Sequence, residues 1–368
     1  MRNSLQTLAP SLLVLALCVG CASVRSWLPG GPERIPSELD AERVPHAIER
    51  AQAELAAGNA ARALDWMNAA TRSKGLSSEL RENAQRLLEQ AADVRLQQLS
   101  VPGADPDELA DMLDLDLPRQ IAVTAAIRAA RAMFAQGDRM DAYRLIKKTD
   151  TKFPLHHERV AAGDLLFEIG ASLAADKSSF LGMFKKTDDA IEVLEYLILY
   201  YPWSGECDQA YATLAAIYED DHEWELAIDR HEKLVLSHPG SSLRTASQAA
   251  IPRLRLAALK SPEYDRSELL QARHELEDWL RAFAGHELEG RVRLDLADCL
   301  RRLADNDLIV ARFYRTVRND YGAQRHAQRA LEEARAAQDE GRAHEAESFL
   351  ARLPAPSAKA AAQPQVSP

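Results

Sequence analysis

The feature that most constrains the fold is a run of small and bulky residues between positions 211 and 239. Small residues stand at Ala215 and Ala227, and two antiparallel helices can approach closely where such side chains face each other. Bulky residues stand around them and a proline closes the run: Tyr211, Leu214, Tyr218, His231 and Pro239. Proline has no backbone N–H and cannot continue a helix. The run therefore predicts a pair of antiparallel helices that ends just before Pro239.

This spacing matches the template of the tetratricopeptide repeat (TPR), a helix–turn–helix unit of about 34 residues. Tyr211 replaces the usual Trp, Ala215 the usual Gly and His231 the usual Phe. A single hairpin of this kind cannot bury its own apolar face, so the match implies further hairpins stacked against it. No stretch shows the period-two alternation of a strand. We predict an all-α fold, a TPR-like solenoid of antiparallel helical hairpins.

The same spacing recurs elsewhere in the chain. Three small residues each precede a proline by the same distance: Ala142 and Pro154, Ala190 and Pro202, Ala227 and Pro239. A residue that tolerates a left-handed backbone stands five positions before several of the small residues. That pattern predicts inter-helix turns at Gly58, Gly137, His222, Asn306 and Gly341, before Ala63, Ala142, Ala227, Ala311 and Ala346. Ala190 and Ala272 are also assigned as small residues of a second helix, but no such turn residue precedes them, so their assignment depends on spacing alone.

A second informative feature lies at the N-terminus. Residues 12–19 form an apolar core, preceded by Arg2, that is too short to span a bilayer, which needs about 20 residues. This arrangement is typical of a secretion signal. The sequence that follows, Gly20-Cys21-Ala22-Ser23, resembles the lipobox of bacterial lipoproteins, although Cys18 stands where that motif usually has Leu. A simply cleaved signal is the disfavoured alternative.

The lipobox resemblance implies that Cys21 is acylated. Ala22, rather than Asp, at the next position implies transport to the outer membrane by the rule for Gram-negative lipoproteins, with the chain lipid-anchored and facing the periplasm. The chain carries 45 Lys and Arg against 56 Asp and Glu, a net charge of −11. This acidic balance argues against nucleic acid as a partner and against an anionic lipid surface. Membrane attachment is expected through the acyl chains.

No motif for catalysis, a cofactor or a metal ion is found. The G-x-S-x-G, Walker and dinucleotide-binding patterns are absent, and each is the local structure that its chemistry requires. His231-Glu232 and His274-Glu275 begin like a zinc-protease motif, but Val235 and Asp278 stand where its second His is needed. The run at 156–158, His-His-Glu, lacks the i, i+4 spacing of a ligand pair and is expected to be a solvated helix start. We predict that the protein is not an enzyme.

The two internal cysteines and three of the tryptophans are interpreted as structural. Cys207 and Cys299 could pair in an oxidising periplasm, but some two repeats separate them, well beyond the roughly 7 Å reach of a disulfide. Buried free thiols are favoured. Trp203, Trp224 and Trp279 could line a peptide groove, since tryptophan is common at binding hot spots, but filling the seams between repeats is favoured for each.

A lipobox followed by hairpins that end in Tyr201-Pro202-x-Ser204 and His238-Pro239-Gly240-Ser241 resembles the outer-membrane assembly lipoproteins of the BamD type. The likeness covers about residues 120–325. It implies a scaffold that binds other envelope proteins, including an outer-membrane β-barrel and its periplasmic domains, and supports the assembly of such barrels. Two departures stand out: residues 41–118 add a helical region, and the repeat at 308–321 ends at Gly322 instead of proline.

An adapter of another envelope machine, for secretion, motility or polysaccharide export, would show the same repeats, so that alternative stays open. The expected organisation begins with a signal peptide and a tether. A helical region that ends in an acidic loop at 101–118 follows, and the TPR array comes after it. The expected parts are residues 1–20, signal; 21–40, flexible tether; 41–118, N-terminal helical region; 119–353, TPR array closing with a hairpin at 323–353; and 354–368, disordered tail.

Overall fold

The computed structural model describes residues 34–101, 104–176, 187–261 and 266–354. Every regular element within these ranges is a helix, and consecutive helices pack against each other. The predicted all-α fold of helical hairpins is confirmed. The chain divides into two compact units, Met1–Ala125 and Ala126–Pro368, with the boundary inside α5 (Arg119–Gln136).

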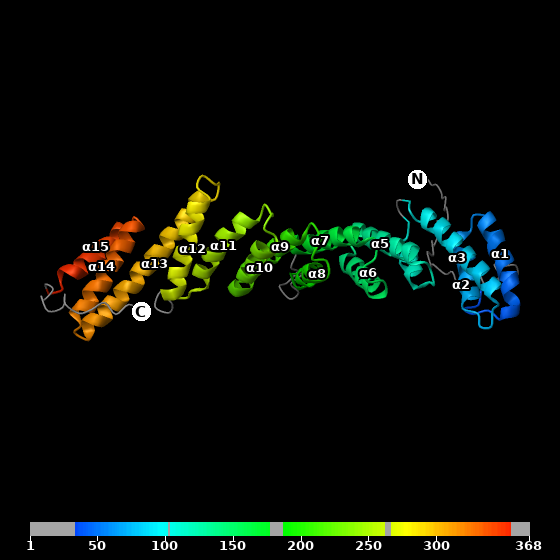
Figure 1. The fold of residues 1–368 in the computed structure, drawn as a ribbon, viewed down its shortest axis with the longest axis horizontal. Coiled ribbons are helices and arrows are strands. Elements are labelled where there is room, and N and C mark those ends of the chain that lie inside the picture. Colours follow the sequence, from blue (N-terminus) through cyan, green and yellow to red (C-terminus); the bar gives the residue numbers. More distant parts are fainter. Residues whose placement is uncertain (1–33, 102–103, 177–186, 262–265, 355–368) are drawn as a thin grey trace, which may run out of the picture. The chain divides into compact units, whose positions relative to one another are not determined.

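The first unit contains α1 (Val44–Ala56), α2 (Ala60–Thr71), α3 (Ser78–Gln98) and α4 (Pro106–Asp111), with 3-10 turns at Ala41–Arg43 and Met112–Asp114. The helix α2 packs against both α1 and α3, and these two also touch (Figure 1). Local capping explains where α3 begins, because the Ser77 hydroxyl accepts a hydrogen bond from the Leu80 N–H at 3.3 Å and so satisfies a donor at the open helix end.

The prediction of a loop over residues 101–118 is wrong for its central part. Asp105 accepts a bond from the N–H of Asp107 and Pro106 occupies the first helical position, a combination that favours helix initiation. In the short helix α4 that begins here, Leu109 is buried, at 3% exposed. Three acidic residues of this segment, Asp107, Glu108 and Asp111, therefore lie on a helix that is anchored by its apolar side.

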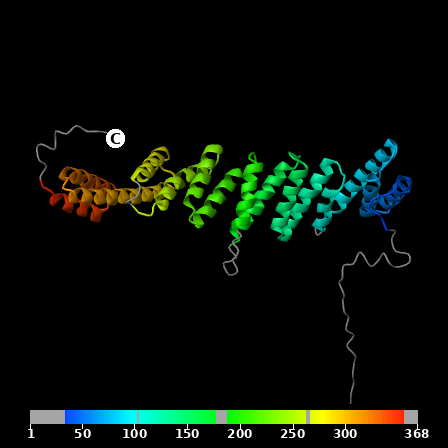
Figure 2. The same cartoon turned by 90° about the horizontal axis from the view of Figure 1, so that it is seen from below.

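The second unit is a succession of helical hairpins, visible as consecutive helix pairs in Figure 1 and Figure 2. Neighbouring helices pack in sequence from α6 onward, and α7–α9, α11–α13 and α13–α15 also touch, as expected when each repeat rests on the next. Its helices are α6 (Arg139–Lys152), α7 (Arg159–Ala175), α8 (Thr187–Tyr200), α9 (Cys207–Asp220), α10 (Trp224–Ser237), α11 (Arg244–Ala258), α12 (Arg266–Ala282), α13 (Glu289–Thr316), α14 (Asp320–Ala336) and α15 (Glu340–Ala351).

The prolines of the sequence pattern follow three helix ends. The helices α6, α8 and α10 end at Lys152, Tyr200 and Ser237, each two residues before Pro154, Pro202 or Pro239. The missing N–H of proline and its clash with the preceding turn prevent these helices from continuing.

Five inter-helix turns share one backbone geometry. In each, a residue with positive φ donates its N–H to the carbonyl three residues back, and the next residue donates to the carbonyl five back, which is the Schellman arrangement at a helix C-terminus. A fully or almost fully buried alanine follows five positions later. The turn residues, with φ, are Gly58 (82°), Gly137 (98°), His222 (61°), Arg318 (56°) and Gln338 (57°), and the alanines are Ala63, Ala142, Ala227, Ala323 and Ala343.

The predicted turns at Asn306 and Gly341 are wrong. Asn306 lies inside the 28-residue helix α13, and Gly341 lies in the first turn of α15. The turns stand instead at Arg318 and Gln338, and the residue after each caps the next helix: Asn319 accepts a bond from the Gly322 N–H at 2.9 Å, and Asp339 from the Arg342 N–H at 3.0 Å. The side-chain cap, rather than glycine, marks these two turns.

The prediction that the repeat at 308–321 ends at Gly322 is also wrong. The helix α13 ends at Thr316, and Gly322 is buried inside α14. A Cβ at Gly322 would lie 2.8 Å from the Tyr314 ring. This glycine is needed for close packing of α14 on α13, not for a helix end.

Opposite effects on stability are expected at two of the turns. Gly137→Val places a β-branched residue at φ 98°, with no atom near the new Cβ, so backbone strain should lower the free energy of unfolding by about 1–2 kcal/mol. Gln338→Gly relieves the same kind of strain and should be neutral or stabilising by up to about 1 kcal/mol, because glycine also loses more entropy on folding. Chemical denaturation of the two variants measures both. Equal and small effects would contradict the assigned turn geometry.

Candidate functional site

The residues that match the TPR template form the seam between α9 and α10. Leu214 and Ala215 of α9 and Ala227 of α10 are fully buried, Tyr218 is almost buried and Tyr211 is half-buried. The alanines allow the close approach that the template implies. These positions hold a hairpin together. The predicted lipidation site, Cys21, lies outside the described residues.

The Asp150 cluster is a buried polar group where α6, α7 and α8 meet. The Asp150 side chain is 9% exposed. It accepts hydrogen bonds from the hydroxyls of Tyr196 at 2.8 Å and Tyr201 at 2.7 Å, and His156 Nε2 lies 3.1 Å away. Arg159 places an Nη1 atom 3.6 Å from the carboxylate and stacks 4.0 Å from the centre of the Tyr201 ring.

The expectation that residues 156–158 form a solvated helix start is wrong for His156, which is 3% exposed. Burial raises the pKa of the Asp150 carboxyl, but hydrogen bonds from His156, Tyr201 and Tyr196 outweigh it and hold that pKa below its usual value. Burial and the Asp150 carboxylate raise the pKa of both tyrosines. A carboxylate enclosed by so many donors is a structural anchor rather than a catalytic base.

A comparable contact joins α9, α10 and α11. His231, the residue in the Phe position of the template, lies with its Nε2 3.3 Å from Glu219 Oε1, and Arg253 donates to Glu219 Oε2 at 2.8 Å. Burial raises the pKa of Glu219, but the hydrogen bonds from His231 and Arg253 hold it below its usual value. The polar replacement of Phe therefore has a partner in the neighbouring helix.

The cysteines and tryptophans follow the sequence interpretation in part. Cys207 and Cys299 are free and buried, as predicted, and burial raises the pKa of the Cys299 thiol to about 12, so it is protonated at neutral pH. Trp279 is buried, as a seam residue should be. Trp203 is 95% exposed, so the seam interpretation is wrong for it. Trp224 is partly exposed and lies beside His222.

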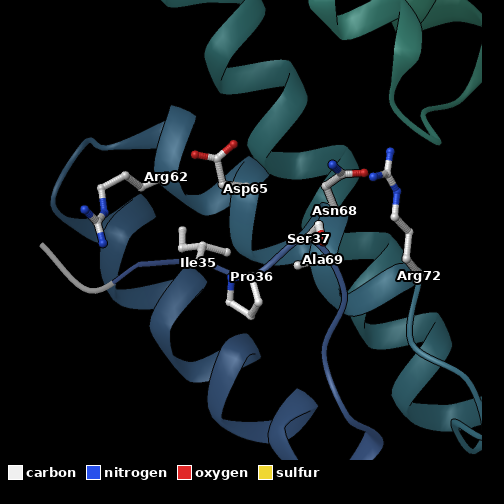
Figure 3. A pocket seen from close by; sticks show the side chains of 8 residues that line it. All are labelled: Ile35, Pro36, Ser37, Arg62, Asp65, Asn68, Ala69 and Arg72. Carbon is white, nitrogen blue, oxygen red and sulfur yellow. The ribbon is translucent and has the colours of Figure 1, made fainter. Parts of the chain in front are cut away.

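The first unit carries a polar pocket of about 450 Å³ between the segment before α1 and the helix α2. Figure 3 shows Arg62, Asp65 and Asn68 in order along α2 and Arg72 just after its end, with Ile35 and Pro36 beside α2. The pocket is open and its charges are of both signs. The pocket lies where residues 35–37, which belong to the predicted tether, meet α2.

Among the described residues of the second unit, three grooves that cross neighbouring hairpins differ in their chemistry. One of about 420 Å³ across α6, α8, α9 and α10 is rich in tyrosine, with Tyr143, Tyr196, Tyr200 and Tyr211 in its lining. Another, of about 340 Å³, across α12 and α14, contains Arg266, Arg273 and Arg329 beside Glu332 and Glu333. The third, of about 380 Å³, lies across α10, α11 and α12, and we call it the acidic groove.

The lining of the acidic groove comes from one face of each helix. On α12, Glu275, Asp278 and Ala282 are spaced so that they share a face. The full lining is Glu232 and Val235 from α10, Gln248 and Ile251 from α11, and Glu275, Asp278, Trp279, Ala282 and Phe283 from α12. From this set, sequence reasoning considered Trp279 as a groove residue and named Glu232, Val235, Glu275 and Asp278 only in rejecting a zinc-protease motif. No local sequence signal marks the groove, because its residues come from three helices that meet only in the fold.

Comparison with known proteins adds no relative. No family model matches the chain, and no curated protein matches it. Among the described residues, no group of three or more His, Cys, Asp or Glu side chains is arranged to hold a metal ion. In the same part of the chain, no helix combines the length and apolar character needed to cross a membrane.

Proposed function

We propose that the protein is an acylated scaffold of the outer membrane that faces the periplasm and supports assembly of outer-membrane β-barrel proteins. The observation that carries the proposal is the lipobox-like Gly20-Cys21-Ala22 placed ahead of a helical-hairpin array. A membrane-tethered solenoid acts through the proteins that it binds, because its extended surface is formed by repeats that contact only their neighbours.

The surface of the second unit supports a binding role. Its three grooves differ in charge and aromatic content, so each can select a different partner segment. The well-bonded Asp150 cluster and the protonated Cys299 thiol are structural groups. Protein–protein binding is therefore the activity that the described residues support best.

The proposal predicts a stable complex in native membranes. Affinity purification of the tagged chain after detergent extraction should recover an integral outer-membrane β-barrel that has periplasmic domains. Depletion of the protein should lower the amounts of many barrel proteins together. Recovery of a secretion, motility or polysaccharide-export component, with unchanged barrel levels, would assign the chain to the adapter function instead.

The substitution Cys21→Ala tests the predicted lipid anchor. Acyl chains contribute about 0.8 kcal/mol for each buried CH₂ group, so the wild-type protein should resist high-salt washing of membranes. The variant should become soluble in the periplasm or accumulate as a precursor. A variant that still fractionates wholly with the outer membrane would show that the lipid anchor is wrong.

A further inference from the structure

The acidic groove combines a net negative charge with an aromatic floor. All three ionisable side chains in its lining are carboxylates: Glu232, Glu275 and Asp278. Arg255 is close by and is divided between several carboxylates, 2.8 Å from Glu232, 3.4 Å from Glu275 and 3.7 Å from Glu268. One guanidinium cannot neutralise three carboxylates, so the local field favours a cation.

The outer end of the groove is also acidic. Asp278 pairs with Arg281 and lies 3.4 Å from His274 Nε2. Both partners have highly exposed side chains, and exposed pairs contribute little and are screened by salt. Asp278 therefore keeps much of its capacity to attract an incoming positive charge.

Two oxygens of the groove lining lack hydrogen bonds. Gln248 Oε1 and Glu275 Oε2 are buried and accept no hydrogen bond within the described structure, although Glu275 Oε2 has an ion-pair partner in Arg255 Nε at 3.4 Å. Pro252, inside α11, has no N–H, so the carbonyl of Gln248 also lacks the helical bond that residue 252 would normally donate. Buried acceptors without donors are costly. Gln248 Oε1 is thus an acceptor that an incoming donor can satisfy.

The floor provides an apolar surface held in a fixed position. Trp279 is 3% exposed, and its indole N–H donates to the Thr245 carbonyl at 3.0 Å. The Phe283 ring lies 5.2 Å from the Trp279 ring, and Val235 and Ile251 complete the apolar lining. Aromatic and aliphatic groups of this kind contact apolar side chains and the stem or plane of a basic one.

We propose that the acidic groove binds a polypeptide segment that carries arginine or lysine next to apolar side chains. The basic group supplies donors to Glu232, Glu275 and Asp278, and the apolar neighbours cover Trp279 and Phe283. The volume of about 380 Å³ is within the range of sites that bind a few side chains. The inference rests on the proposed protein-binding role, but it does not depend on which envelope complex the protein serves.

The test uses the full chain, purified from membranes in detergent, and two short fluorescein-labelled peptides. One peptide contains leucine and arginine, and its counterpart has glutamate at each arginine position. Fluorescence anisotropy should show binding of the arginine peptide that weakens as salt is added, and weaker or no binding of the glutamate peptide. Equal binding of both peptides, or of neither, would overturn the proposal.

Variants locate the binding to this groove. The double variant Glu275→Gln, Asp278→Asn should weaken binding of the arginine peptide at least about tenfold, a difference of about 1.4 kcal/mol. Glu277→Gln is the control, because Glu277 is on the same helix but pairs with Arg273 and is not in the lining. Asp278→Lys should shift preference towards the glutamate peptide. Equal affinities for the double variant and the control would place the binding elsewhere and contradict the proposal.

The outcome is separable from that of the proposed function. If the membrane complex contains a β-barrel but the double variant binds the arginine peptide normally, the function holds and the groove assignment fails. If the groove binds as expected but the complex belongs to another machine, the groove assignment holds and the barrel-assembly function fails. Circular dichroism and melting of each variant verify that it is folded.

Discussion

Asp150→Ala is expected to lower the free energy of unfolding by roughly 3–5 kcal/mol, the usual cost of breaking a buried charged cluster by removing one partner. The substitution leaves the hydroxyls of Tyr196 and Tyr201 without the carboxylate that accepts from them. It also leaves His156 and Arg159 without their carboxylate partner. Because the donors come from α7, α8 and the residues next to them, one substitution disturbs the contact between two hairpins. Chemical denaturation followed by circular dichroism measures the change.

Asp141→Ala is the matched control for this prediction. Asp141 is also on α6, but it pairs only with Arg144, and both side chains are more than half exposed. Removal of such a pair should change stability by no more than about 0.5 kcal/mol. Similar small effects of both substitutions would show that the Asp150 cluster does not stabilise the hairpin junction.

The Asp150 cluster also predicts a pH dependence. Hydrogen bonds hold the pKa of Asp150 below its usual value despite burial, so this carboxylate contributes stability above its ordinary pKa of 3.8 that is lost as pH falls below it. The acid limb of the stability profile should be shallower in the Asp150→Ala variant than in the wild type.

The hairpins could be predicted from sequence because small residues, turn residues and prolines leave local signals. Gly137 and Pro154 bracket α6 almost as the spacing implied. The turns at Arg318 and Gln338 could not be recognised by the same rule, since neither residue favours a left-handed backbone. Their caps, Asn319 and Asp339, were the available signal. The continuous α13 was missed because Asn306 was interpreted as a turn residue, whereas it is buried in the helix.

The polar contacts between helices left no local signal. Tyr201 reaches Asp150 across 51 residues of sequence, and Arg266 reaches Asp307 across 41. Only the fold shows that these residues meet. The acidic groove was missed for the same reason, because Glu232 and Glu275 approach each other only when α10 and α12 pack on α11.

Asp150, Glu219 and Asp307 are buried or partly buried acids at junctions of the second unit, each bonded to groups from neighbouring helices. Asp150 joins α6 to α7 and α8, and Glu219 joins α9 to α10 and α11. Asp307 of α13 accepts from Arg266 of α12 at 2.6 Å and lies 2.5 Å from His326 of α14. The apolar seams are rich in alanine and leucine, and such side chains allow neighbouring helices to pack in many alternative registers. A buried acid with donors from specific helices restricts the packing to one of them.

The junction at Asp307 has a second carboxyl group, Glu333 of α14. Burial raises the pKa of Glu333 and the neighbouring Asp307 raises it further, to about 7, against the opposing effect of Arg266 and Arg273. Arg266 Nη2 lies 3.6 Å from Glu333. Two neighbouring carboxyl groups joined by a hydrogen bond, as Glu333 and Asp307 are, share a proton more readily than they carry two charges. The protonated Glu333 is therefore the stable form below neutral pH.

Glu333→Gln should consequently stabilise the protein at pH 8 and have little effect at pH 5. The folded state binds the proton more tightly than the unfolded state, so wild-type stability falls as pH rises from the ordinary value of 4.5 to about 7. The loss is on the order of 3 kcal/mol, at 1.36 kcal/mol per pKa unit. Glutamine keeps an N–H donor for Asp307 and cannot ionise, so the variant should show no such loss.

Denaturation at both pH values tests this expectation, with Glu332→Gln as the control. Glu332 is adjacent in sequence but exposed, and it accepts a bond from Gln328, so its removal should change stability equally and slightly at both pH values. A gain in stability for Glu333→Gln that is the same at pH 5 and pH 8 would show that a shared proton is not what stabilises the α13–α14 junction. A loss at pH 8 would show that Glu333 is ionised in the folded state and stabilised by Arg266 and Arg273.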